Sequence, residues 1–95
     1  MAVYLIAYEL RQPERNYEPF YAALKTYTHA RVLETAWLVE SAHNAARIRD
    51  TLHATLDADD GLIVARCEGE LGWNKIDGDS DLWLLQRFRG SQQPG

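Results

Sequence analysis

MAVYLIAYEL, residues 1–10 of this 95-residue chain, has the alternation of a β-strand but is apolar on both of its sides. Val3, Leu5, Ala7 and Glu9 share one side, and Tyr4, Ile6, Tyr8 and Leu10 share the other. A strand with one face in water would carry a polar residue at every second position, and here the first charged residue is Glu9. We therefore expect both faces of this strand to be covered by apolar groups.

Length and composition predict one soluble domain at residues 1–88, followed by a flexible tail at residues 89–95. No apolar run approaches the roughly 20 residues of a membrane span, and the start lacks a signal-peptide pattern, so we expect a cytoplasmic protein. The single cysteine, Cys67, excludes an internal disulfide framework. The net charge of −4 counts against a protein whose main role is to bind nucleic acid, although it leaves room for a local basic patch.

Two helices are predicted after this strand. Asn16 and Pro19 are typical of a helix start, and apolar residues at helical spacing predict a helix at residues 17–27. Ser41 is predicted to cap the second helix, which ends at the turn signal DADDG, residues 57–61. The buried stripe of this second helix is expected to consist of Ala45, Ile48, Leu52 and Leu56.

Three further strands complete the predicted sheet. ARVLETAWLVE, residues 30–40, is rich in strand formers but too long for one strand, which predicts a bend near residues 34–35 and a second strand at 35–40. GLIVARC, residues 61–67, is the fourth strand. The order is β-α-β-β-α-β, which predicts an α+β, ferredoxin-like fold: a four-stranded antiparallel sheet with two helices on one face and the first and third strands in its centre.

Helices on one face leave the other face of so short a chain without a cover. We therefore expect a homodimer, and we place Tyr4, Ile6 and Tyr8 in its interface. The C-terminal segment has two alternative predictions. One is a helix at about residues 81–87 capped by Asp79 or Ser80, with Trp73 and Ile76 packed back on the domain, and the other is a fifth strand that crosses to a partner subunit.

Three motifs in this order resemble the CRISPR-associated protein two family, and more closely its stand-alone SinR-like and VapD-like small relatives. The opening YLIAYEL is similar to the family's first strand, RVLETAWLVE to its second and third strands, and residues 48–73 to the second helix, acidic turn and fourth strand of the SinR-like branch. The resemblance covers about residues 1–76. It implies a homodimer of two ferredoxin-like sheets and a metal-dependent endonuclease acting on RNA or DNA.

The resemblance makes Glu9 the candidate catalytic residue and metal ligand, because the family carries an aspartate at the end of the first strand that binds a divalent ion between subunits. A carboxylate one methylene longer can still bind Mg²⁺ or Mn²⁺, but octahedral geometry tolerates displacement poorly. An acid at a strand end is more often an exposed boundary residue. Arg11 and Arg31 are the candidate nucleic-acid contacts, and Arg31 matches a basic position of the family.

Two hypotheses about function remain open at this point. The first is a symmetric, metal-dependent nuclease with Glu9 as ligand. The second is a catalytically inactive dimer of the same fold that acts as a scaffold or interaction module. The fold by itself does not decide between them.

Overall fold

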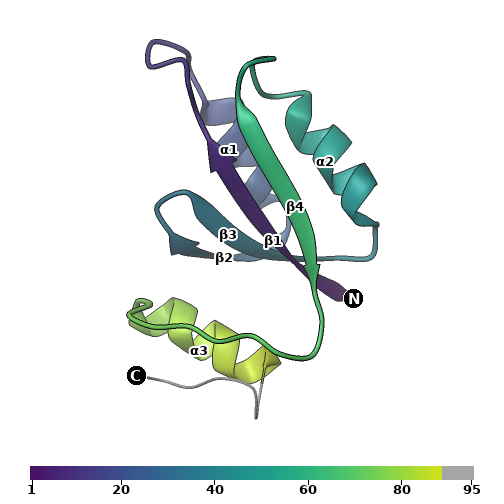
Figure 1. Cartoon of the computed structure of the whole chain (residues 1–95), viewed down its shortest axis with the longest axis vertical. Coiled ribbons are helices and arrows are strands. Elements are labelled where there is room, and N and C mark those ends of the chain that lie inside the picture. Colours follow the sequence, from purple (N-terminus) through teal and green to yellow (C-terminus); the bar gives the residue numbers. More distant parts are fainter. Residues whose placement is uncertain (89–95) are drawn as a thin grey trace.

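The computed structural model describes residues 1–88, so the predicted tail at 89–95 lies outside the described residues. These residues form an α+β unit with four strands and three helices (Figure 1). In chain order the elements are β1 (Ala2–Glu9), α1 (Glu18–Lys25), β2 (Thr28–Leu33), β3 (Ala36–Ser41), α2 (Ala45–His53), β4 (Gly61–Cys67) and α3 (Gly78–Arg87). None of the helices within residues 1–88 has the length and apolar character of a membrane span.

The strands form one antiparallel sheet in the order β2-β3-β1-β4, so the first and third strands lie in the centre as predicted. The predicted bend at residues 34–35 is confirmed, because this turn joins β2 to β3. A register shift between Arg31 and Leu33 accompanies the turn. A bulge of this kind changes the direction of neighbouring side chains. Here Val32 and Leu33, although adjacent in the sequence, both line the same hollow on the sheet.

The starts of the helices differ slightly from their predictions. Ser41 ends β3 instead of capping α2, and its hydroxyl oxygen accepts a hydrogen bond from the His43 N–H. The cap of α2 is Asn44, whose side chain accepts a hydrogen bond of 2.9 Å from the Arg47 N–H. Ser and Asn are both favourable caps, so the sequence offered two possible caps three positions apart. Because β3 extends through Ser41, the cap of α2 is Asn44.

One face of the sheet packs against α1 and α2. Tyr4, Ile6 and Tyr8 of β1 are buried here, in a core completed by residues of both helices and of β3. These three side chains are therefore covered within the chain, and the prediction that they form a dimer interface is wrong. Both faces of β1 are apolar, so alternation alone did not tell which face the helices take. Leu56, predicted on the second helix, is buried but lies in the turn after α2. The other buried members are Phe20, Leu24, Trp37, Val39, Ile48 and Leu52.

The opposite face is covered in part by the C-terminal segment of the same chain. Val3 and Leu38 of the sheet pack against Leu84 and Phe88, and residues 68–77, which we call the linker, contribute further apolar side chains. The C-terminal segment is thus a helix, α3, and not a fifth strand. Figure 1 shows α3 set apart from α1 and α2, beneath β2 and β3 in this view.

Candidate functional site

Glu9, the predicted metal ligand, lies at the end of β1, and its side chain is 70% exposed. Its carboxylate oxygen Oε1 accepts hydrogen bonds from Arg11, at 3.0 Å from Nε and 2.5 Å from Nη2. The same guanidinium donates to the backbone oxygen of Asp59. Gly61 stands opposite Glu9 on β4, where a Cβ atom would lie 3.2 Å from Arg11 Nη2, so the missing side chain leaves room for the guanidinium.

This arrangement makes Glu9 and Arg11 an exposed ion pair across the end of two neighbouring strands. A guanidinium on the carboxylate opposes the approach of a divalent cation, because it already balances the negative charge that would attract one. Within residues 1–88 no three His, Cys, Asp or Glu side chains gather in a way that could hold a metal ion. A single chain therefore does not fit the Mg²⁺ or Mn²⁺ site that the resemblance implies.

Arg31, the second predicted nucleic-acid contact, lies on the helix-covered side of β2. Its guanidinium is 5.3 Å from the ring centre of Tyr21 and 5.5 Å from that of Trp37. It also donates to the backbone oxygen of Glu34, at 2.7 Å from Nη2. These contacts fix Arg31 against two aromatic rings. The structure brings Arg31 and Glu9 to the rim of one surface hollow, whereas Arg11 and Glu9 line another.

Tyr8 belongs to the core beside the hollow that Glu9 and Arg31 line. Its hydroxyl accepts a hydrogen bond of 3.0 Å from Trp37 Nε1 and donates one of 3.1 Å to the backbone oxygen of Glu34. Burial raises the pKa of the Tyr8 phenol above its ordinary value. The two hydrogen bonds of this buried hydroxyl stabilise the turn between β2 and β3. Because its pKa is raised, the phenol is not suited to act as a base near neutral pH.

Asp60 is a buried acid that no pattern in the sequence singles out. Its carboxylate accepts hydrogen bonds from the backbone N–H of Arg11 at 2.8 Å, the hydroxyl of Tyr17 at 2.8 Å and the backbone N–H of Asp57 at 2.9 Å. Burial acts to raise its pKa, but these three donors and the nearby charge of Arg15 together outweigh burial and lower it. Asp60 therefore ties the connection between β1 and α1 to the turn before β4.

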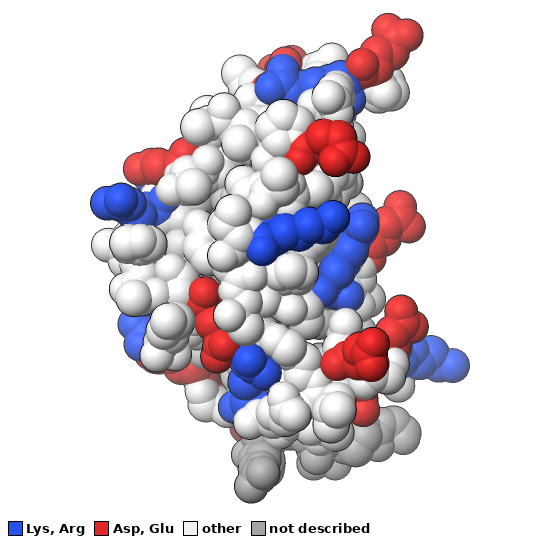
Figure 2. All heavy atoms as spheres, turned by 180° about the vertical axis from the view of Figure 1, so that it is seen from behind, with Lys and Arg blue, Asp and Glu red and all other residues white. Residues whose placement is uncertain are grey.

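Charged side chains are intermixed on the surface. Figure 2 shows Lys and Arg scattered with Asp and Glu over a mostly uncharged face, seen from behind, with no continuous basic ridge across it. Several cations are paired with nearby acids, as in Arg49 with Asp50 and Arg66 with Glu68. This face is not the single-sign surface that is typical of proteins that bind nucleic acid without a partner.

An exposed apolar area, which we call the open patch, lies on the sheet face opposite α1 and α2. Leu33 is 57% exposed and Ile63 is 64% exposed. Register places Leu5 beside Ala65 and Ala7 beside Ile63, so these residues share this face with Leu33. The sequence had predicted an apolar second face, but only the fold shows which part of it the chain leaves uncovered. The open patch consists of Leu5, Ala7, Leu33, Ile63 and Ala65.

Comparisons of the chain with models of protein families, with curated proteins and with solved structures gave no match. The resemblance to the CRISPR-associated protein two family therefore stays a prediction. Two features of the described residues bear on function, the Glu9–Arg11 ion pair and the open patch.

Proposed function

We propose that the protein is a catalytically inactive homodimer with a ferredoxin-like fold that serves as an interaction module, and that its open patch binds a second copy of the chain. The exposure of Leu33 and Ile63 on one sheet face is the observation that carries this proposal. Exposed apolar side chains that cluster on a sheet face are typical of interaction sites. The strand order β2-β3-β1-β4, with α1 and α2 on one face, supports the ferredoxin-like assignment.

The surroundings of the open patch suit a symmetric interface. The patch itself carries no charge, and the exposed Glu9–Arg11 pair lies at the end of the same strands. An apolar centre with charged groups at its border is the usual anatomy of a protein interface. A two-fold axis through the patch would bury Leu33 and Ile63 of both copies, since an isologous interface uses the same surface on each subunit.

Analytical ultracentrifugation of charged variants tests this proposal. The wild type is expected to sediment as a dimer at micromolar concentration, whereas Leu33→Glu and Ile63→Glu are expected to sediment as folded monomers, because each places a charge in the apolar centre. Leu82→Glu is the matched control, since Leu82 is 56% exposed on α3 and lies outside the open patch. A monomeric wild type, or an equal loss of dimer in the control, would contradict the proposal.

A second candidate function, cleavage of RNA or DNA, is favoured by one observation. Glu9 follows Leu5 and Ala7 on the side of β1 that carries the open patch, so a dimer formed there would bring two Glu9 side chains toward one interface. A single chain has no set of metal ligands, and this hypothesis therefore depends on the dimer.

The test is cleavage of labelled single- and double-stranded RNA and DNA with Mg²⁺ or Mn²⁺ by wild type, Glu9→Ala and the control Glu14→Ala. We expect no cleavage by any of the three. Cleavage by the wild type and Glu14→Ala that is lost in Glu9→Ala would overturn the inactive dimer and establish the nuclease. Cleavage that is equal in all three would point to a contaminant or another site.

A further inference from the structure

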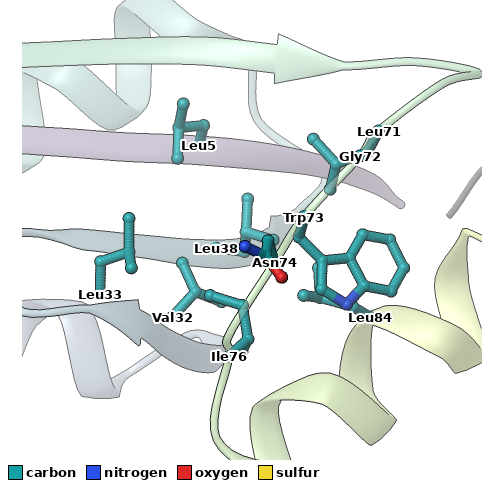
Figure 3. Close-up of a pocket in the computed structure, with 10 residues that line it drawn as sticks. All are labelled: Leu5, Val32, Leu33, Leu38, Leu71, Gly72, Trp73, Asn74, Ile76 and Leu84. Carbon is teal, nitrogen blue, oxygen red and sulfur yellow. The ribbon is translucent and has the colours of Figure 1, made fainter. Parts of the chain in front are cut away.

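A second apolar feature, a pocket of about 200 Å³, lies between the sheet and the linker. Figure 3 shows side chains of the strands on one side of it, with the linker and α3 on the other. Leu5, Val32, Leu33 and Leu38 come from the sheet, and Leu84 comes from α3. The remaining lining residues belong to the linker and are Leu71, Gly72, Trp73, Asn74 and Ile76.

The chemistry of the lining is simple, because none of these ten residues is charged. Asn74, which is exposed, supplies the one side-chain amide, and Figure 3 shows it among the apolar side chains. Trp73 has its indole Nε1–H bound to Asp81 Oδ1 at 2.7 Å, which holds its ring at the pocket. Water against this lining finds few polar partners, so an apolar group that displaces it loses few hydrogen bonds.

The size of the pocket sets the size of its occupant. The pocket opens to solvent where Leu33 and Asn74 are exposed, and its volume of about 200 Å³ can hold one substituted aromatic ring, since an enclosed apolar cavity of about 150 Å³ in another protein binds benzene. The chain's own C-terminal residues, RGSQQPG at 89–95, contain no large apolar side chain and do not match the lining. A charged ligand does not match it either, because it would be desolvated without a counter-charge.

We propose that this pocket binds a small, uncharged molecule of one aromatic ring, with the Asn74 amide as hydrogen-bond partner for a single polar substituent. Binding would fill space that the linker and sheet leave open, so that each lining side chain gains dispersion contacts. The linker lacks regular secondary structure, and it is held through side chains such as Trp73. This loop-like cover allows the molecule to enter without opening the sheet. The pocket shares Leu5 and Leu33 with the open patch, so a dimer formed there would border the pocket, but binding of the ring does not require that dimer.

Methyl NMR of the full chain with three probes tests this proposal. Toluene, phenol and benzoate share one ring and differ in polarity and charge. We expect toluene and phenol to cause saturable shifts at the methyl groups of Val32, Leu38 and Leu84, and benzoate to cause none. Val32→Phe, which fills the pocket, is expected to abolish the saturable shifts, whereas the control Leu82→Ala, outside the pocket, is expected to keep them.

Asn74→Leu provides a second variant at an exposed position, in case Val32→Phe does not fold. It is expected to lower the preference for phenol over toluene by about three- to tenfold, because it removes the hydrogen-bond partner and leaves the apolar contacts. Shifts that rise linearly without saturation, or that are equal in Val32→Phe, would overturn the proposal. So would a dimer in which the pocket methyl groups contact a second copy and the probes cause no shift.

Discussion

The two faces of the sheet are covered in different ways. On one face, α1 and α2 seal a continuous core in which Ile6, Phe20 and Leu24 are fully buried. On the other face, one helix and an irregular linker cover part of the surface, and they leave a pocket of about 200 Å³ and the open patch beside it. Regular helices present side chains at fixed spacing and fill the space between layers, whereas an irregular segment fills it incompletely. The first face therefore stabilises the fold, and the second is where the molecule has surface left for binding.

Leu24→Ala and Leu84→Ala give a matched comparison of the two faces, since both leucines are helical and almost wholly buried. The largest expected effect is that of Leu24→Ala, a loss of about 3–5 kcal/mol in the free energy of unfolding, because the sealed core cannot collapse around the cavity. Urea unfolding monitored by circular dichroism measures it. A loss below about 1 kcal/mol would show that the α1/α2 face is not a close-packed core.

Leu84→Ala is expected to cost less, about 2–3 kcal/mol, because the adjacent pocket already deprives Leu84 of some contacts. Its effect is also expected to be local. In native-state hydrogen exchange the amides of α3 should lose protection while those of β1 and β3 keep theirs. Equal loss of protection in α3 and in the central strands would mean that the second face is as strongly coupled to the fold as the first.

Asp60→Asn tests the polar tie beside the α1/α2 face. We expect a loss of about 1–2 kcal/mol in the free energy of unfolding at pH 7, because three donors then lose a charged acceptor. The pKa of Asp60 is lowered by folding, so its contribution is fully present above the unfolded value of about 3.9 and is lost as the pH falls through the folded value.

The stability difference between wild type and Asp60→Asn should therefore shrink as the pH is lowered below about 4. Urea unfolding at a series of pH values measures this difference. A difference that stays constant from pH 7 down to pH 2 would show that the charge of Asp60 does not stabilise the fold.

The smallest expected effect concerns the ion pair that fastens α3 to β3. Arg87 Nη2 lies 3.0 Å from Glu40 Oε1, both side chains are less than a quarter exposed, and the guanidinium stacks on Trp83 at 3.7 Å. Glu40→Gln is expected to cost about 0.5–1 kcal/mol, whereas the control Asp50→Asn, in an exposed pair with Arg49, should cost close to nothing. Equal values in thermal unfolding would show that the Glu40–Arg87 pair adds nothing to the attachment of α3.

Much of the fold followed from periodicity in the sequence. The two-sided apolar pattern of residues 1–10 identified a central strand, and helical spacing identified α1 and α2. The predicted packing of Trp73 and Ile76 against the domain is confirmed, but the path of the linker could not be predicted, because Leu71, Trp73 and Ile76 follow neither a helical nor a strand period. Their partial burial comes from tertiary packing against the sheet, which covers part of the second face from within the chain.

The candidate site was predicted less well than the fold. Glu9 was selected through the resemblance, but the sequence did not show that Arg11, two residues further on, would pair with it and also bond to the backbone oxygen of Asp59. Asp60 lies in the run DADDG, where no local pattern separates it from its acidic neighbours. Two of its three donors, the Arg11 N–H and the Tyr17 hydroxyl, are more than 40 residues away in the sequence, so only the folded chain reveals it.

Isotope-filtered NMR on a mixture of labelled and unlabelled protein tests most directly the claim that the second face, and not the first, meets a second copy. We predict intermolecular contacts at the methyl groups of Leu33 and Ile63, and none at Leu24 or Ile48 beneath the helices. Intermolecular contacts confined to the outer surfaces of α1 and α2, or a monomer with none at all, would contradict the account.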